Sequence, residues 1–497
     1  MQDLESHETS GLLNKQSSTS QTQPQRRAVA LTIVVALVAT TALVNLVPSG
    51  RGGGLRATRL EVGAAAADDD AASVATGSAA AVTDSTVKAG SAPAAGASLQ
   101  DKFAAAFQSI LDEEATAWDC AFSVAVKTEG ESAALTAGVI DKATGATGKP
   151  SDVWAWGSVT KPLTGAQVLH LADEGKFDLD DAAAPIIDEY IQNIAQQQGD
   201  AWNFTWTSLE ELFQNASVND ITIRQLLAMQ APIPDFDTGG LRDYLASGKS
   251  GTAWQVLDSV KDAYPLTPLQ YSSTNFVLLG MIVAHFADGL PLEETDQAYY
   301  LPSHLKSQLH FGQNGQTASE WTDVKFYDRT AGKAGEVRHD EWSEKPGIFI
   351  GWGASDLAAS VPVVAELFYE IYGAQTVTKQ VDEMLKFHHD PVWGYEYGLA
   401  TMSAGVPGIP MYGHGGDTYG AESQAHYSPV LKASVVVASN VEIPHESQTK
   451  YVNCMAWAAL VKTMTPLAHS IRESCNDIGN TVPRDLYRDQ NLRKASN

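Results

Sequence analysis

The chain has 497 residues, of which 44% are hydrophobic, so it is long and apolar enough to bury a sizeable core. Lysine and arginine total 33 against 59 aspartate and glutamate residues, and the formal net charge is −26. A chain this acidic repels phosphate backbones, which argues against nucleic acid as a partner, and we expect most of the excess acid to lie on a solvated surface.

The N-terminal part of the chain predicts a membrane anchor. Residues 1–27 are polar and rich in Ser, Gln and Thr, which predicts a disordered tail. Residues 28–47 are uncharged and mostly apolar, and as a helix they would extend about 30 Å, the thickness of a hydrocarbon core. A cleaved signal peptide has a shorter apolar region, and the polar, Gly-rich flanks argue against a buried core helix. We therefore predict a transmembrane signal anchor at 28–47.

Orientation of this anchor is not fixed by flanking charge, because each end carries three basic residues: Lys15, Arg26 and Arg27 before it, and Arg51, Arg56 and Arg59 after it. An N-terminal anchor ahead of a large globular domain usually leaves that domain outside the cytosol. We expect a type II, single-pass protein whose globular domain is luminal or extracellular.

Two short patterns are compatible with that location. The segment ETSGLL, residues 8–13, resembles an acidic dileucine sorting signal and favours endosomal or vacuolar traffic. Asn203 and Asn215 each begin a glycosylation sequon, which predicts a glycoprotein. Both kinds of pattern also arise by chance in a chain of this length.

Beyond the anchor, the composition divides the chain into three parts. Residues 48–97 are of low complexity, rich in Ala, Gly and Ser, and predict a flexible stalk. Residues 98–470 form the predicted globular domain, and 471–497 a polar C-terminal tail.

Within the globular domain, strands are predicted near both ends and helices between them. AFSVAV and AALTAGVI predict paired strands, and MYGHGG, SQAHYSP and ASVVVAS predict strands near the other end. Residues 158–390 have mostly helical patterns, and NCMAWAALVKTM predicts a last helix. The expected fold is one sheet assembled from distant segments, with a helical insertion.

Three cysteines neither form a disulfide framework nor have metal-binding spacing. If one bridge forms, Cys454 and Cys475 are the most plausible pair. Cys120 lies in a predicted buried strand and is expected to be an inert core thiol.

A Ser-x-x-Lys pattern occurs four times, beginning at Ser85, Ser158, Ser303 and Ser447. Only Ser158 follows an apolar, aromatic stretch and begins an amphipathic helical pattern. Residues three apart on a helix share a face, so the Lys161 amine can reach the Ser158 hydroxyl. A nearby amine and the positive end of a helix dipole are what a weak hydroxyl nucleophile requires. The alternative is a helix-capping Ser followed by an exposed Lys.

Two further segments contain residues that could act with this pair. Tyr271 precedes an apolar helical run, and a phenol can relay protons when nearby cations lower its pKa. His414 is followed by Gly415 and Gly416 at a strand end, where glycines would let a substrate approach. The backbone N–H of Asp417 could then form an oxyanion hole with that of Ser158. Taken singly, Tyr271 is more often a core residue, and a His beside glycines more often a turn.

In combination, five ordered segments resemble the serine beta-lactamase and penicillin-binding-protein-like hydrolases, especially the class C, D-alanyl-D-alanine carboxypeptidase and esterase branch. The segments are WGSVTKPLT, ITIRQLLAMQAPIPDFD, YSSTNFVLLG, GWGASDLA and YGHGGDTYGAES, and the resemblance covers roughly residues 105–465.

This resemblance implies an α/β sandwich (α+β), an antiparallel sheet flanked by helices, with a mostly helical lobe. It implies acylation of Ser158 by a small-molecule or peptide-like acyl substrate, followed by hydrolysis. Lys161 would accept or share the Ser158 proton, Tyr271 would relay a proton to the leaving group, and His414 would take the position where relatives carry Lys or His. It implies no metal and no cofactor.

One departure concerns the Tyr-x-Asn motif of the family, which here reads Tyr271-Ser272-Ser273. The Asn amide contacts the lysine and binds a substrate carbonyl, and a Ser273 hydroxyl is too short to do both. Asn275 is two positions too late and on another helical face. The AMQAPIPDFD segment also replaces the usual Thr-Ser-Gly-type loop. These changes favour an esterase- or amidase-like activity over beta-lactam or peptide hydrolysis.

The main alternative is a catalytically inactive binding or scaffold protein that keeps the fold, and the change at Ser273 is its best support. Joint retention of Ser158, Lys161, Tyr271 and His414 argues against it, because a pocket without selected chemistry should lose some of them. An unrelated chain with chance motifs is the third alternative.

Overall fold

The residues that the computed structural model describes are 96–237, 239–312, 315–330, 340–390, 392, 394, 396–406, 409–443, 447–464 and 475. The predicted tail at 1–27, the anchor at 28–47, nearly all of the stalk and all of the C-terminal tail except Cys475 lie outside these residues. Among the described residues, no helix is both long enough and apolar enough to cross a membrane.

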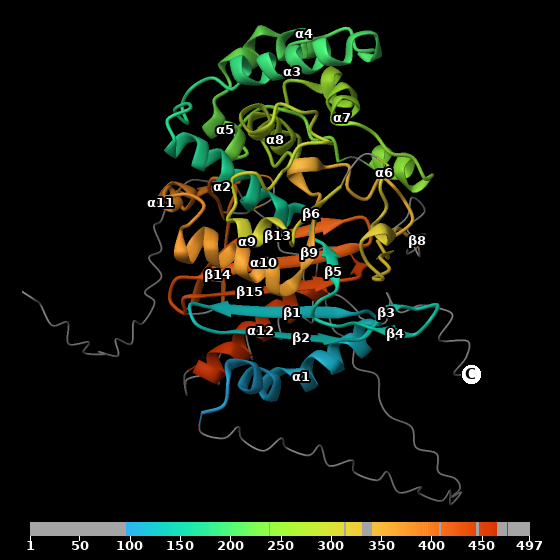
Figure 1. Ribbon diagram of the computed structural model, residues 1–497, viewed down its shortest axis with the longest axis vertical. Helices are drawn as coiled ribbons and strands as arrows, with labels where there is room; N and C mark the ends of the chain where they lie inside the picture. Colours follow the sequence, from blue (N-terminus) through green and yellow to red (C-terminus); the bar gives the residue numbers. More distant parts are fainter. Residues whose placement is uncertain are drawn as a thin grey trace, which may run out of the picture. The chain divides into compact units, whose positions relative to one another are not determined.

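The centre of the described domain is an antiparallel sheet, which runs across the middle of Figure 1. In the described part of the chain its strands are, in spatial order, β10 (His388–His389), β11 (Glu396–Tyr397), β12 (Met402–Val406), β13 (Ile409–Thr418), β14 (Ala421–Ser428), β15 (Ala433–Ser439), β1 (Phe122–Thr128) and β2 (Ser132–Ala137). Phe122 of β1 pairs with Ser439 of β15, so the predicted sheet built from distant segments is confirmed.

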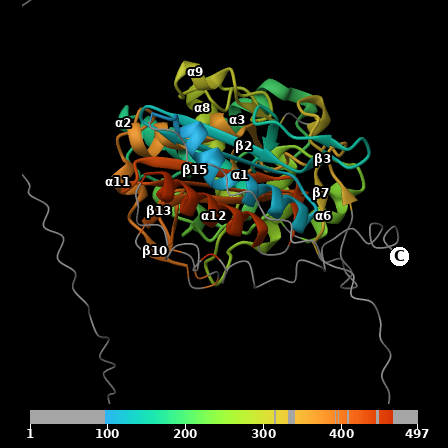
Figure 2. The same cartoon turned by 90° about the horizontal axis from the view of Figure 1, so that it is seen from below.

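Both faces of the sheet are buried, and β1 shows why. Side chains alternate between the two faces of a strand. Phe122, Val124 and Val126 therefore enter one core, while Ala125 enters the other. The first core is closed by α1 (Leu99–Trp118) and α12 (Ser447–Met464), which lie next to each other across one face of the sheet (Figure 2).

The opposite face of the sheet supports the rest of the domain (Figure 1). There α10 (Val361–Phe368) packs on β1 and β15, and α2 (Thr160–Asp173) lies between the sheet and a helical lobe. The lobe contains α3 (Ala184–Gln198), α4 (Leu209–Phe213), α5 (Ile223–Leu227), α6 (Gly239–Ala246), α7 (Ala253–Val260) and α8 (Thr274–Ala287). The predicted sandwich with a mostly helical lobe is confirmed.

Short elements complete the described chain. A small sheet consists of β5 (Val153–Ala155), β9 (Leu357–Ser360) and β6 (His310–Phe311). The others are β3 (Val139–Asp141), β4 (Ala146–Thr147), β7 (Tyr327–Asp328), β8 (Asp340–Glu341), β16 (Val441–Glu442), α9 (Ser303–Lys306) and α11 (Val381–Met384).

The cysteines follow the predicted pattern. Cys454 of α12 is joined to Cys475 by a disulfide, which ties the segment after α12 back to the domain. Cys120 is buried next to β1 as a free thiol, and burial raises its pKa to about 12. Such a thiol is inert at neutral pH, as the sequence suggested.

Candidate active site

Ser158 stands where a short strand turns into a buried helix. It lies in a single 3₁₀ turn, η1 (Gly157–Val159), after β5 and directly before α2. Trp154 and Trp156 are fully buried and anchor this turn, and the Trp156 indole N–H donates to the carbonyl of Ala359 at 2.9 Å. Ser158 itself remains partly exposed, so its hydroxyl is accessible at the N-terminal end of the helix.

Two glycines allow β13 to pass very close to this turn. Gly157 has a φ of 53°, and a Cβ on it would lie 2.2 Å from the carbonyl oxygen of Asp417. A Cβ on Gly416 would lie 2.1 Å from the carbonyl oxygen of Trp156. The space at Gly416 is therefore taken up by contact with the protein's own chain, whereas the sequence had suggested room for substrate there.

Lys161 lies one helical turn after Ser158 and is fully buried. Its Nζ lies 2.8 Å from Ser158 Oγ and 3.0 Å from the carbonyl oxygen of Ala354, so both acceptors are uncharged. The amine also lies 5.0 Å from the centre of the Tyr271 ring. The predicted approach of the amine to the serine hydroxyl is present, and the exposed-lysine alternative does not describe this structure.

Burial lowers the pKa of Lys161 to about 7, because charging an amine away from water is unfavourable. The negative charges of Asp235, Asp417 and Asp237 act in the opposite direction and keep the pKa from falling further. A lysine in this state is neutral in a large fraction of molecules at neutral pH and can accept a proton.

Tyr271 is half-buried and precedes α8. Burial, followed by the neighbouring Tyr397, raises the pKa of the Tyr271 phenol well above its usual value, while the Ser158 hydroxyl acts to lower it. The phenol is therefore protonated at neutral pH and lies near both Ser158 and Lys161, where it can donate a proton.

His414 is buried in β13 behind Tyr271, and the centres of the two rings are 6.1 Å apart. Its Nδ1–H donates to the carbonyl of Gly415, and its Nε2 accepts from the Tyr397 hydroxyl at 3.2 Å. Burial, together with the nearby Lys161 charge, lowers the pKa of His414 to about 3. His414 is thus a neutral group that supports the two tyrosines, and its hydrogen bonds do not lead to Ser158.

The part of β13 that passes Ser158 has an open edge. β12 pairs with β13 only as far as Gly413, whereas β14 pairs with it up to Thr418. Thr418 and Ala421 flank a two-residue hairpin loop, so the backbone groups of Thr418 hydrogen bond to β14. Backbone N–H groups of successive residues in a strand point to opposite edges, so the N–H of Asp417 points to the edge that β12 leaves open. The N–H of Ser158 also lacks an intrahelical acceptor at the helix start. These two N–H groups are thus left without strand or helix acceptors, and the oxyanion hole that they would form stays a prediction.

Ser273 occupies the position where the family has Asn. Its backbone N–H donates to Asp235 Oδ1 at 3.1 Å, and its hydroxyl lines a cavity beside Ser158. Asn275 does not replace the missing amide, because its Nδ2 is directed at Met229 Sδ at 3.7 Å inside the core. The expectation that Asn275 lies on another helical face is confirmed.

Asp235 is a site residue that sequence reasoning missed. It belongs to the AMQAPIPDFD segment, and burial and then the charge of Asp237 raise its pKa to about 7. Its charge acts on Lys161, so the two groups titrate together. The signal in the sequence was the pair of aspartates inside an otherwise apolar segment, but their neighbour in space could not be read from it.

The cavity beside Ser158 has a volume of about 40 Å³ and is mostly polar. Its walls include the side chains of Asp237, Arg242, Ser273, Asp417, Tyr419 and Glu442. Arg242 donates through Nε to Asp328 at 3.0 Å and through Nη2 to Glu442, and its guanidinium lies 5.2 Å from the centre of the Tyr419 ring.

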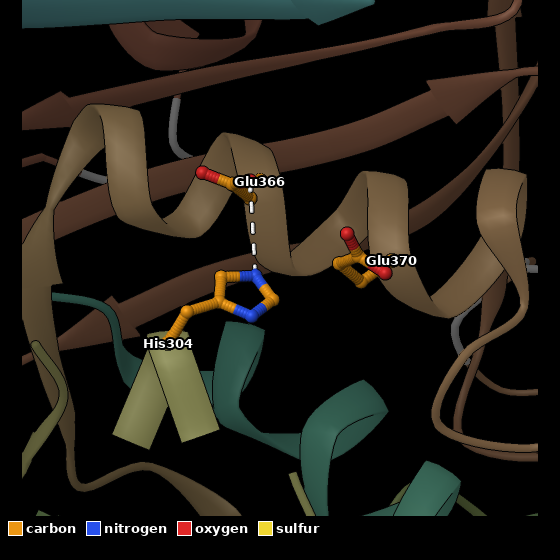
Figure 3. A group of neighbouring side chains, drawn as sticks. All are labelled: His304, Glu366 and Glu370. Carbon is orange, nitrogen blue, oxygen red and sulfur yellow. Dashed lines mark ion pairs between the residues drawn. The ribbon is translucent and has the colours of Figure 1, made fainter. Parts of the chain in front are cut away.

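One cluster outside this cavity has ligand atoms spaced as for a metal ion, and it is shown in Figure 3. The Nε2 of His304 lies 3.8 Å from Oε1 of Glu366 in α10, and the Glu370 side chain lies next to them. However, Glu366 already forms an ion pair with Lys127 at 3.3 Å, and Glu370 accepts from the Thr376 hydroxyl at 2.5 Å. These partners compete with a cation, so we assign no metal to the cluster.

The fold and the serine–lysine pair at the start of a buried helix define a serine hydrolase of the beta-lactamase type. The sequence model of the beta-lactamase family matches residues 121–452, and the chain belongs to that family. The predicted family membership and the predicted serine hydrolase class are thereby confirmed.

Individual relatives are distant. Protein flp of Staphylococcus aureus (strain NCTC 8325 / PS 47) is 23% identical over 298 residues, which cover 57% of this chain and 49% of that protein. The chain thus spans about half the length of the curated relatives it matches.

Solved structures of the same fold include the D-amino acid amidase of Ochrobactrum anthropi SV3 in complex with L-phenylalanine amide. Its TM-score is 0.56 and its sequence identity 18%, and the match covers 73% of this chain and 98% of the amidase. The D-stereospecific amidohydrolase of a Streptomyces species has a TM-score of 0.52, 21% identity and coverage of 68% and 94%. The octameric penicillin-binding protein homologue of Pyrococcus abyssi has a TM-score of 0.55, 19% identity and coverage of 71% and 76%.

Proposed function

We propose that this protein hydrolyses an ester or amide through an acyl-enzyme formed on Ser158. The observation that carries the proposal is the Lys161 Nζ, which lies 2.8 Å from Ser158 Oγ with a pKa lowered to about 7. A serine hydroxyl is a weak nucleophile unless a neighbouring base removes its proton, and a neutral amine at hydrogen-bond distance is such a base.

The reaction proceeds in two halves. Lys161 takes the Ser158 proton while Oγ attacks the substrate carbonyl carbon, and the N–H groups of Ser158 and Asp417 stabilise the resulting oxyanion. Tyr271 donates its proton to the leaving alcohol or amine as the carbonyl–leaving-group bond breaks, and the protonated Lys161 restores the tyrosine proton. Water then attacks the acyl carbon while Lys161 accepts a proton from it. As the bond between the acyl carbon and Ser158 Oγ breaks, Lys161 returns that proton to Oγ, and the carboxylic acid product leaves.

The substrate class follows from what the site retains and lacks. Ser273 cannot reach as far as the family's Asn, so the carbonyl contact that beta-lactams and peptides use is weakened. An activated ester needs less help with its leaving group. Two proteins of the same fold are named as amidases or amidohydrolases, which supports small amides as the second substrate class.

We further propose that residues 28–47 anchor the enzyme as a single-pass type II protein, with the catalytic domain in a luminal, endosomal, vacuolar or extracellular space. The Cys454–Cys475 disulfide supports an oxidising compartment. Of the two sequon residues, Asn203 is exposed, whereas the side chain of Asn215 accepts a hydrogen bond from the Ser217 N–H at 3.0 Å. Asn203 is therefore the better glycan acceptor, and a mobility shift with a glycosidase, lost in Asn203→Gln, would test this.

Covalent labelling by a fluorophosphonate probe tests the catalytic proposal. The wild-type chain should be labelled, and Ser158→Ala should remove the label. Ser303→Ala is the matched control, because Ser303 has the same spacing to a lysine but is exposed on α9, and it should label normally. Folded wild-type protein that stays unlabelled, or labelling that survives in Ser158→Ala, would refute the proposal.

A further inference from the structure

Negative charge is concentrated in the wall of the cavity that opens beside Ser158. Asp237 and Asp417 line this cavity and are both exposed to it. Partial desolvation and then the charge of Asp417 raise the pKa of Asp237, so the two carboxylates repel each other. The Tyr419 hydroxyl donates to Asp237 Oδ1 at 3.2 Å but brings no positive charge. An incoming cation would relieve this repulsion.

Arg242, the cation in the same wall, is already neutralised. Its two ion pairs, with Asp328 and Glu442, place one positive charge between two carboxylates that are almost fully buried. Its flat face covers the ring of Tyr419. Arg242 therefore holds the wall together. Arg242 and Lys161 both lower the pKa of Asp237, but burial and the charge of Asp417 outweigh them, so the negative charge in the wall is only partly offset.

A third acceptor faces the cavity without a partner. Ser273 is only 8% exposed and lines the cavity, yet no group in the described part of the chain hydrogen bonds to its Oγ. Its Oγ stays accessible to solvent through the cavity. The hydroxyl can therefore accept a hydrogen bond from a ligand group that enters the cavity.

We propose that this cavity binds an ammonium group of the substrate, so that the enzyme selects esters or amides that carry a free amine near the scissile carbonyl. An ammonium has three N–H donors, and Asp237, Asp417 and the Ser273 hydroxyl offer three acceptors. The volume of about 40 Å³ suits a head group of that size rather than a bulky side chain. This inference rests on the proposed hydrolase function, whose substrate it narrows.

Two other occupants fit less well. A substrate carboxylate would face Asp237 and Asp417 directly, and the neutralised Arg242 could not offset that repulsion. A metal ion needs ligand atoms close to one another. In the part of the chain that the structure describes, the cluster of His304, Glu366 and Glu370 meets that condition, and the cavity residues do not.

Direct binding to the full-length Ser158→Ala protein tests the inference without requiring catalysis. Calorimetric titrations would compare benzylammonium, benzyl alcohol and benzoate, which share a ring and differ in charge. Benzylammonium should bind at least about tenfold more tightly than benzyl alcohol, since hydrogen bonds to charged groups are about twice as strong as neutral ones. Benzoate should bind more weakly than both, and added salt should reduce the preference.

Two variants test whether Asp237 accounts for the preference for benzylammonium. Asp237→Asn should bring the affinity of benzylammonium to within about twofold of that of benzyl alcohol, if the charge accounts for the tenfold preference. Asp200→Asn removes the same charge from an exposed site in the turn Gly199–Ala201 and should keep the full preference. Equal binding of the three probes, tighter binding of benzoate, or a preference that survives Asp237→Asn would overturn the inference. Fluorophosphonate labelling of the wild type reports separately on the hydrolase function.

Discussion

Two basic residues near Ser158 have opposite surroundings: Lys161, which is buried behind the serine, and Arg242, which lines the cavity beside it. Lys161 donates only to neutral oxygens, and burial lowers its pKa to about 7. Arg242 lies between two carboxylates, which raise its pKa despite its burial. Lys161 can therefore lose its proton near neutral pH, whereas Arg242 stays charged. Within one site, the partners of a buried cation decide whether it serves as a base or as a structural cross-link.

The largest effect is expected from removing the base. In Lys161→Ala, the rate of fluorophosphonate labelling should fall about a thousandfold, within the usual range for general-base catalysis. Lys161→Arg should be nearly as slow, because a guanidinium stays protonated. Stopped-flow or gel-based labelling kinetics measure both. Lys306→Ala, at the matching position after Ser303, is the control and should react at the wild-type rate.

A labelling rate for Lys161→Arg close to that of the wild type would contradict the contrast between Lys161 and Arg242, because a permanently charged side chain could then activate Ser158 as well as a neutral amine does. Thermal unfolding of each variant would show whether a slow rate reflects lost folding instead.

The next effect concerns stability. In Arg242→Gln, Asp328 and Glu442 lose their cation while buried, and the free energy of unfolding should fall by about 3 kcal/mol. Denaturant titration measures this loss. Arg224→Gln is the matched control, because Arg224 also pairs with two carboxylates, Asp180 and Glu383, but near the surface. Water screens that cluster, so its loss should be much smaller.

Equal losses for Arg242→Gln and Arg224→Gln would mean that burial does not distinguish the two clusters. A gain in stability for Arg242→Gln would contradict the structural role given to this residue.

The fold was largely predictable from the sequence, because it depends on patterns within short segments. The apolar run AFSVAV at 121–126 predicted the strand found as β1, and the buried residues Phe103, Phe107 and Leu111 of α1 have the spacing typical of a helix. The Ser158–Lys161 contact was predictable for the same reason, since three residues of helix fix it.

The rest of the site depends on contacts between distant segments. Asp235 and Lys161 are far apart in the sequence, and only the folded lobe brings the carboxylate within electrostatic reach of the amine. The orientation of His414 depends on Tyr397, which belongs to a two-residue strand too short to predict. The pairing of Arg242 with Glu442 likewise follows from the packing of α6 near β16 and leaves no pattern in either segment.

The smallest expected effect is a shift in pH dependence. The negative charge of Asp235 raises the pKa of Lys161, so Asp235→Asn should lower that pKa further. The acid limb of the labelling rate should then move to lower pH, and the variant should be relatively faster than the wild type in mild acid. Rate profiles between pH 5 and 9 would show this, with Asp200→Asn as the control that removes an equal, exposed charge. A shift toward higher pH would contradict the assigned influence of Asp235.

The most direct test of the neutral-lysine base is the pH profile of Ser158 labelling in the wild-type protein. Because the protonated amine cannot accept the serine proton, the rate should be low in acid, rise with a midpoint near the Lys161 pKa of about 7, and level off above it. The Lys161→Arg profile should lack this rise. A midpoint near the ordinary pKa of lysine, about 10.4, or the same rise in Lys161→Arg, would contradict the account.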